Sequence, residues 1–169
     1  MEILTNKLKK SYLAEALIIY NFFIQNTYSN FEEKKLSLNS FLSLKKKITY
    51  NKLPFILAKK NKKIIGLAFV NKFRDKSGYR YTYEHSIYVD HKMVNKGYGY
   101  KILKELIINC RKNKKIKNLV AVIGGSNNIS SIKIHKKNGF KLIGTIKKAG
   151  YKKNKWIDSV YMQKILWII

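Results

Sequence analysis

The stretch Glu84–Lys101, EHSIYVDHKMVNKGYGYK, decides how the chain is organised. Its first six residues carry the β-branched and aromatic side chains of a strand. Its second half holds Gly97 and Gly99 and leads into a segment with apolar residues at helical spacing, namely Ile102, Leu103, Leu106, Ile107 and Cys110. A strand, a glycine-containing turn and an amphipathic helix predict a phosphate cradle, because glycines allow close backbone approach and a helix N-terminus attracts anions. The short Gly-x-Gly alone is equally compatible with a structural turn.

Length and composition indicate one ordered domain. The chain has 169 residues, 46% of them hydrophobic, and a single proline, so we expect one folded unit over residues 1–169. Cys110 is the only cysteine, which excludes an intrachain disulfide and a thiolate metal cluster, and its place on the apolar helix face predicts a core residue. The sequence shows no signal pattern and no stretch of about 20 apolar residues, so a soluble cytoplasmic protein is expected.

The charge of the chain is extreme, since 36 Lys and Arg against 9 Asp and Glu give a formal net charge of +27. Clustered lysines bind nucleic acid through phosphate contacts, so a basic nucleic-acid-binding protein is one hypothesis. Here, however, the lysines are spread along the chain, and Lys, Ile, Asn and Tyr are abundant together, as expected for an A/T-rich genome. We therefore favour compositional drift and expect no specific nucleic-acid partner. The field would still attract anionic ligands.

Apolar periodicity divides the rest of the chain into helices and strands. Helices are predicted over residues 11–26, 37–47 and 129–137, the second capped by Ser37 or Asn39 and the last ended by Asn138-Gly139. Strands are predicted over residues 55–59, 64–70, 81–89, 119–123, 140–147 and 159–166, with polar loops over 27–31, 71–78 and 149–158. This order predicts an α/β (α+β) fold with one mixed sheet flanked by helices.

Residues 94–99, VNKGYG, resemble the turn Arg/Gln-x-x-Gly-x-Gly/Ala of the GNAT superfamily of acyl-CoA-dependent N-acyltransferases. The preceding EHSIYV resembles the central strand of the phosphinothricin/methionine-sulfoximine N-acetyltransferase branch, and residues 19–33, 73–89 and 127–166 resemble that branch in the same order. The resemblance therefore covers nearly the whole chain. It implies the GNAT fold with splayed central strands, and acetyl-CoA as the acetyl donor without a metal.

The resemblance also implies a cofactor surface. Backbone groups of Tyr88 and Val89 are expected to pair with the pantetheine arm, and the Val89 N–H to polarise the thioester carbonyl. Val94 stands where the family has Arg or Gln, so backbone amides with Lys96 or Lys101 must bind the pyrophosphate. The expected cofactor residues are Tyr88, Val89, Val94, Asn95, Lys96, Gly97, Tyr98, Gly99, Tyr100, Lys101, Asn128 and Ser131. Helix capping is an equal alternative for Asn128.

Acyl transfer to an amine needs a proton acceptor, an oxyanion donor and a proton for the departing thiolate. Glu84 is the predicted general base, because a carboxyl partly buried at a strand start has its pKa raised; an ion pair with lysine is the alternative. His135 lies where the branch has a histidine, and is predicted to protonate the thiolate or relay the amine proton; a locally satisfied helix histidine is the alternative. His85 should point away from Glu84 and His91 lies in the turn, so the three dispersed histidines predict no metal site.

The predicted acceptor side depends on a cationic loop. Arg74, Lys76 and Tyr79 lie where the branch commonly offers two arginines and a tyrosine, and Lys76 keeps the charge without bidentate geometry. Such a loop beside the amine suits an amino acid carrying a carboxylate; the alternative is that these are solvated surface charges. Phe31 is expected to close the pocket, and by resemblance its loop crosses to the second subunit of a homodimer.

The leading hypothesis is an N-acetyltransferase that moves an acetyl group from acetyl-CoA to a small amino acid or analogue, such as phosphinothricin or methionine sulfoximine, by direct attack on the thioester. One alternative keeps the fold but takes a protein N-terminus or an amine antibiotic as the acceptor. The other is the nucleic-acid-binding protein. The expected partners are acetyl-CoA, the small amine and a second copy of the chain, with no membrane.

Overall fold

A seven-stranded mixed sheet forms the centre of the molecule in the computed structural model, which describes residues 1–5 and 8–167. The strand order is β1-β2-β3-β4-β5-β7-β6, so β7 lies between β5 and β6. The elements are β1 (Glu2–Leu4), α1 (Lys10–Asn26), α2 (Leu38–Tyr50), β2 (Phe55–Lys60), β3 (Lys63–Lys72), η1 (Ser77–Tyr79), β4 (Thr82–Val89), η2 (His91–Met93), α3 (Tyr98–Arg111), β5 (Asn118–Gly124), α4 (Ile129–Lys137), β6 (Lys141–Lys152) and β7 (Lys155–Ile165).

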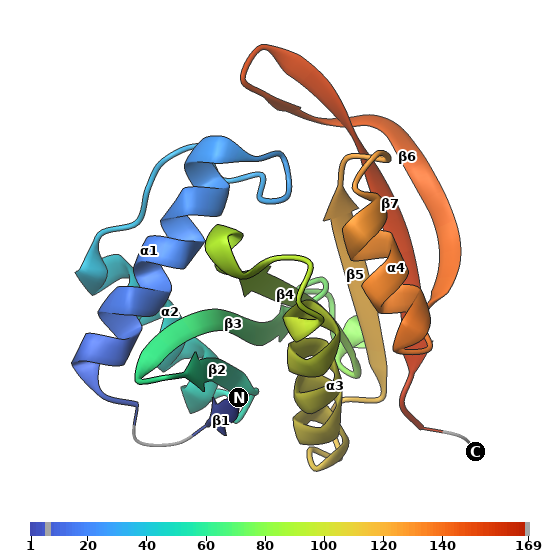
Figure 1. The fold of residues 1–169 in the computed structure, drawn as a ribbon. Coiled ribbons are helices and arrows are strands. Elements are labelled where there is room, and N and C mark those ends of the chain that lie inside the picture. Colours follow the sequence, from blue (N-terminus) through green and yellow to red (C-terminus); the bar gives the residue numbers. More distant parts are fainter. Residues whose placement is uncertain (6–7, 168–169) are drawn as a thin grey trace.

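The helices cover both faces of the sheet (Figure 1). On one face, Tyr20 of α1 is buried, with its ring 5.2 Å from that of Tyr88 in β4 and 5.6 Å from that of Phe41 in α2. On the other face, α3 buries the predicted stripe that includes Cys110, which is confirmed as a core residue. A Cβ atom on Gly66 of β3 would lie 2.7 Å from Ile102, which shows how closely α3 packs on the sheet.

The two central strands separate after a short parallel contact. β4 pairs with β5 only from Thr82 to Glu84, opposite Asn118 to Val120, and the last partners are Glu84 and Val120. Beyond that point β4 stays bonded to β3 as far as Val89, while β5 stays bonded to β7 as far as Gly124. The predicted splay of the central strands is therefore confirmed, and we call the point where they part the fork.

Two features of the sheet differ from the sequence prediction. β1 was not predicted, because three residues are too few to show a periodic pattern. The prediction of a polar loop over residues 149–158 is wrong: β6 runs to Lys152, β7 starts at Lys155, and Lys153 and Asn154 make the turn with φ values of 51° and 58°. The residues of this hairpin are polar because much of β6 faces solvent, which hides the alternation that identifies a strand.

The tip of the β6–β7 hairpin folds back over the end of α1 (Figure 1). Lys152 is only 2% exposed, and its Nζ donates to the carbonyl oxygens of Ile24 at 2.6 Å and Asn30 at 2.5 Å. A Cβ atom on Gly150 would lie 2.3 Å from the ring of Phe31. The hairpin therefore fixes the segment after α1, residues 27–33, which we call the acceptor loop.

Candidate active site

A cavity of about 610 Å³ opens at the fork. Its walls come from α1, the acceptor loop, β4, the turn before α3, β5 and α4. A Cβ atom on Gly124, at the end of β5, would lie 2.0 Å from the Tyr28 carbonyl oxygen, so the acceptor loop passes directly across the end of β5. Most of the predicted site residues line this cavity, namely Glu84, His135, Tyr88, Val89, Val94, Asn95, Gly97, Tyr98, Gly99, Tyr100, Asn128, Ser131 and Phe31.

The turn before α3 has the geometry of an anion cradle. Gly97 caps the helix with φ of 76°, a left-handed conformation that favours glycine. The hydrogen bond from the Lys101 N–H to the Gly97 carbonyl is 3.3 Å long, so the N–H groups of Tyr98, Gly99 and Tyr100 precede the helical ladder. These groups and the positive end of the helix dipole fit a pyrophosphate.

Gly99 is constrained to be glycine for a different reason from Gly97. A Cβ atom there would lie 3.2 Å from Cδ1 of Ile134 in α4 and 3.7 Å from Val89, so a larger side chain would push α3 and α4 apart. Gly97 has no atom within 4 Å of such a Cβ, and its constraint is conformational. The cradle therefore depends on one glycine for its backbone and on the other for helix packing.

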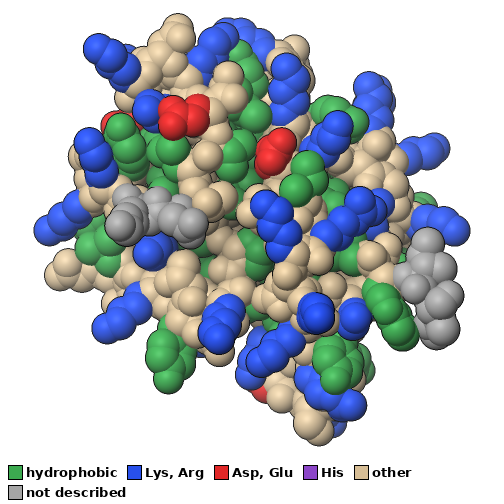
Figure 2. Space-filling model, turned by 90° about the horizontal axis from the view of Figure 1, so that it is seen from below, with side chains coloured by type: hydrophobic (Ala, Val, Ile, Leu, Met, Phe, Trp, Pro, Cys, Tyr) green, Lys and Arg blue, Asp and Glu red, His purple; other side chains and the backbone are tan. Residues whose placement is uncertain are grey.

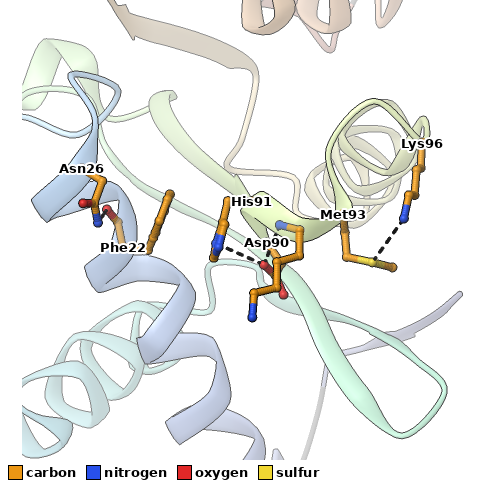
Figure 3. Close-up of polar contacts among 7 residues, drawn as sticks. Phe22, Asn26, Asp90, His91, Met93 and Lys96 are labelled. Carbon is orange, nitrogen blue, oxygen red and sulfur yellow. Dashed lines mark hydrogen bonds and ion pairs between the residues drawn. The ribbon is translucent and has the colours of Figure 1, made fainter.

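Lys96 and Lys101 do not line the cavity, although sequence reasoning placed them in the cradle. The Lys96 Nζ lies 4.0 Å from Sδ of Met93, in the exposed turn shown in Figure 3. A cation that the sequence did not indicate is Lys60 of β2, whose Nζ donates to the Tyr98 hydroxyl at 2.5 Å. It is distant in sequence, so no local motif could reveal it.

The turn between β4 and α3 also rests on α1. The ring of His91 stacks on Phe22 with centroids 4.0 Å apart, and its Nδ1 lies 3.3 Å from Oδ1 of Asp90, as Figure 3 shows. Oδ1 of Asp90 also accepts from the Lys92 N–H. His91 is therefore a support of the turn and lies outside the cavity lining.

The backbone of β4 presents bonding groups to the open side of the fork. The Asp90 N–H donates to Ile65 of β3, and the Tyr81 carbonyl accepts from residues 117 and 118 beside β5. Backbone groups alternate in direction along a strand, so those of Ile87 and Val89 face the opening. By the same alternation, the backbone of Tyr88 faces β3, and its side chain packs among the rings of α1.

Glu84 lies at the last position where β4 pairs with β5, and it lines the cavity. Burial raises the pKa of its carboxyl, and the positive charge of Arg74 opposes that rise. Glu84 makes no ion pair with a lysine among the described residues. The carboxyl can therefore take up a proton at a higher pH than an exposed glutamate.

His135 and His85 meet at the fork. Their Nε2 atoms are 2.9 Å apart, and the two side chains belong to residues that are 2% and 5% exposed. His85 does lie on the opposite strand face from the neighbouring Glu84, yet it lines the same cavity. Sequence reasoning gave His85 little weight because it should point away from Glu84, and no local pattern indicates its contact with His135, which is 50 residues away.

Asn128 is a helix cap and a cavity residue at once. Its Oδ1 accepts from the Ser131 N–H at 3.3 Å, and its Nδ2 donates to Oγ of Ser29 at 3.2 Å. The capping alternative is thus present, and the bond to Ser29 ties α4 to the acceptor loop. Ser131 lines the cavity beside it.

The predicted acceptor residues divide into two groups. Phe31 lines the cavity, but Arg74, Lys76 and Tyr79 do not. The Arg74 guanidinium lies 5.3 Å from the ring centre of Phe73, and it is close enough to Glu84 to act on its pKa. Arg74 therefore lies on the rim near the general-base candidate, in the same loop as Lys76 and Tyr79, and none of the three is part of the cavity wall.

Acceptor-side residues that the sequence did not indicate are Ser29, Asn30 and Glu32, all in the acceptor loop, and Ser86 in β4. Glu32 and Glu84 are two of the nine acidic residues of the chain, whereas no described residue of the lining is Lys or Arg. The cavity therefore suits a cationic amine, although the exterior is basic. Lys and Arg side chains are spread over the face seen in Figure 2 and do not form one patch there.

The described residues also bear on metal binding and on membrane insertion. No group of three or more His, Cys, Asp or Glu side chains is arranged to hold a metal ion. Among those residues, no helix has both the length and the apolar character needed to cross a membrane.

Known proteins resemble this chain in both sequence and fold. Residues 7–161 match the family described as Acetyltransferase (GNAT) domain. The chain is 31% identical over 148 residues to the phosphinothricin N-acetyltransferase of Alcaligenes faecalis, which covers 88% of this chain and 75% of that protein. A ribosomal-protein-alanine N-acetyltransferase from Brucella melitensis has a TM-score of 0.92 at 30% identity, with 98% of this chain and 99% of that one covered.

A further solved structure carries the cofactor. The GNAT superfamily phosphinothricin acetyltransferase from Sinorhizobium meliloti, in complex with AcCoA, has a TM-score of 0.89 at 30% identity, with 98% of this chain and 89% of that one covered. The predicted fold, enzyme class and acetyl donor are therefore confirmed. The chain belongs to the GNAT superfamily of acetyl-CoA-dependent N-acetyltransferases, within the phosphinothricin acetyltransferase branch.

Proposed function

We propose that the protein transfers the acetyl group of acetyl-CoA to the amine of a small amino acid or analogue, of the phosphinothricin or methionine sulfoximine type, by direct attack on the thioester. The proposal rests on the position of Glu84. Its carboxyl has a raised pKa, and it lies where β4 and β5 separate and the cavity opens between them. A base with a pKa nearer the working pH removes the proton of a bound ammonium efficiently.

The cavity fits acetyl-CoA on its own geometry. The N–H groups of Tyr98, Gly99 and Tyr100 would hold the pyrophosphate, and the backbone of Ile87 and Val89 would pair with the pantetheine arm. When bound, acetyl-CoA supplies an activated acetyl group. The Val89 N–H would then stand near the thioester carbonyl and stabilise negative charge on its oxygen.

The acceptor is proposed to lie between Glu84 and the acceptor loop. Glu32 and Glu84 would attract its ammonium group, and Glu84 would remove the first proton. Arg74 and Lys76, on the rim, would hold its carboxylate by charge. Phe31 would cover the bound acceptor, since its ring is held against Gly150.

A GNAT enzyme for a protein N-terminus is the second candidate, favoured by the similarity to the ribosomal-protein-alanine N-acetyltransferase. The covered cavity supports a small acceptor over a peptide, because the acceptor loop is tied to β5, α4 and the hairpin. The proposal extends to a cytoplasmic homodimer, built as one domain over residues 1–169, without a specific nucleic-acid partner. The dispersed surface lysines in Figure 2 support the last point.

A thiol-release assay with acetyl-CoA and a panel of amines tests the proposal. The panel holds phosphinothricin, methionine sulfoximine, 3-(methylthio)propylamine, an alanine-started peptide and an aminoglycoside. We expect the two amino-acid analogues to have the highest kcat/KM, and the amine without a carboxylate to be poor. Preference for the peptide or the aminoglycoside would overturn the proposed acceptor class.

A further inference from the structure

Two buried imidazoles form a direct hydrogen bond at the fork. Nε2 of His85 in β4 lies 2.9 Å from Nε2 of His135 in α4, and the ring of Phe140 packs 5.2 Å from both. His85 is the first residue of β4 after its pairing with β5 ends. The pair therefore joins β4 to α4 where β4 loses its contact with β5.

The hydrogen-bond network assigns the tautomers. Nδ1 of His135 lies 2.7 Å from the Ser131 carbonyl oxygen, which only accepts, so Nδ1 carries the hydrogen. A neutral imidazole has one N–H, so Nε2 of His135 accepts and Nε2 of His85 donates. Nδ1 of His85 then has no hydrogen. It is buried and has no hydrogen-bond partner among the described residues.

This arrangement limits what the pair can do. Both N–H groups of the pair already donate a hydrogen bond. The one nitrogen without a hydrogen-bond partner is Nδ1 of His85, which carries no hydrogen. Burial lowers the pKa of both imidazoles, and the charge of His135 lowers that of His85 further. Phe140 is the apolar neighbour of both rings, whereas the backbone of Ser131 favours a proton on His135 and that of Val120 favours one on His85, so both backbone groups oppose the effect of burial. In its resting neutral state, the pair can accept a proton and has none to give.

We propose that His85 is a positioning residue for acetyl transfer: its Nε2–H holds His135 as the Nδ1–H tautomer, so that the two imidazoles accept one proton as a unit. The inference rests on the proposed function and deepens it. An acceptor ammonium that becomes an amide loses two protons, and the thiolate of CoA gains one. Glu84 takes the first proton; the pair takes the second, carries one positive charge, and becomes neutral again when the sulfur is protonated.

The matched variants are His85→Gln and His85→Asn. The amide nitrogen of Gln reaches the place of Nε2 and can still donate to His135, whereas that of Asn reaches the place of Nδ1 and cannot. We expect kcat to fall about 10–100-fold in His85→Asn, by analogy with the loss of a group that orients a metal-binding histidine, and by less in His85→Gln, which keeps the donor to His135 but cannot share the proton. The affinity for acetyl-CoA should be unchanged in both. Equal kcat in His85→Asn and the parent would overturn the inference.

Nuclear magnetic resonance of the parent protein tests the tautomers without any variant. Long-range ¹H–¹⁵N spectra should show hydrogen on Nδ1 of His135 and on Nε2 of His85, and both rings should titrate with one shared midpoint below the ordinary histidine pKa of about 6.5. Hydrogen on Nε2 of His135, or two independent midpoints, would contradict the pair. If no amine is acetylated, the proposed function fails, and the spectra alone decide the inference.

Discussion

The two sides of the cavity are built in different ways. The cofactor side, residues 84–101, is one continuous stretch in which a strand, a turn and a helix follow one another. The acceptor side combines the acceptor loop, the rim around Arg74, and the tip of a hairpin more than 110 residues further along the chain than that loop. The difference teaches that, in the proposed function, local backbone geometry would hold the donor and long-range packing would hold the acceptor. The first prediction below concerns the residue where the two sides meet, and the later ones change one side and leave the other intact.

Glu84→Gln should have the largest effect, because Glu84 stands where both sides meet. We expect turnover to fall about 10²–10⁴-fold with unchanged acetyl-CoA affinity, since the change removes a proton acceptor and leaves the cradle. Steady-state kinetics with isothermal titration calorimetry checks this. Loss of acetyl-CoA binding would show that Glu84 helps to hold the donor and is not only a proton acceptor.

The same variant has a stability readout. Burial raises the pKa of Glu84 in the folded protein, so its ionisation opposes folding once the pH rises above the unfolded value of about 4.5. Glu84→Gln should therefore be more stable than the parent at neutral pH, and this gain should vanish as the pH falls toward that value. Thermal unfolding at several pH values measures it. A constant difference at every pH would exclude the ionisation as its cause.

Lys152→Met should weaken only the acceptor side. Two carbonyl oxygens, of Ile24 and Asn30, would lose their buried donor, which costs about 1–3 kcal/mol of unfolding free energy. The acceptor KM should rise, with acetyl-CoA affinity kept. Lys153→Met is the matched control, since Lys153 is the exposed neighbour in the turn. Equal effects of the two variants would remove the hairpin from the acceptor side.

Gly97→Val should weaken only the cofactor side. A β-branched residue in the left-handed conformation costs about 1–2 kcal/mol, which corresponds to roughly tenfold or more in acetyl-CoA affinity if the turn rearranges. Lys96→Ala should change affinity by less than about twofold, because an exposed charge contributes little. Calorimetry with both variants decides whether backbone or side chain forms the cradle; the reverse ranking would contradict it.

Arg74→Ala should have the smallest effect. Loss of one charged contact at an exposed rim should raise the KM of an amino-acid acceptor by roughly tenfold or less and leave the KM of an amine without a carboxylate unchanged, whereas the rise in the Glu84 pKa should act on the kcat of both acceptors alike. Arg80→Ala is the control from the same loop, as its guanidinium bonds Ser77 and lies over Tyr81. If both variants act alike on both acceptors, the rim does not recognise the carboxylate.

The comparison also explains what the sequence could predict. Gly97, Gly99 and the apolar stripe of α3 form a local pattern, and Glu84 lies near the start of its strand, so the cofactor side and the sheet around it were predictable from one stretch. The His85–His135 bond, Lys60 beside Tyr98 and the buried Lys152 were not, because each joins segments at least 38 residues apart. From the sequence, a lysine at a hairpin tip is expected to be exposed to solvent. Only the structure shows the carbonyl oxygens that bind its ammonium group.

The place of β7 inside the sheet has a consequence for the order of events during protein synthesis. β7 pairs with β5 on one side and β6 on the other, so the sheet stays divided until this segment has left the ribosome. The nascent chain can form β4 and the turn before α3 earlier, because β4 pairs with β3, which is already made, and only the contacts with β5 and α4 have to follow. The hairpin that anchors the acceptor loop arrives last. The turn proposed to hold the pyrophosphate would therefore take shape before the acceptor loop is anchored.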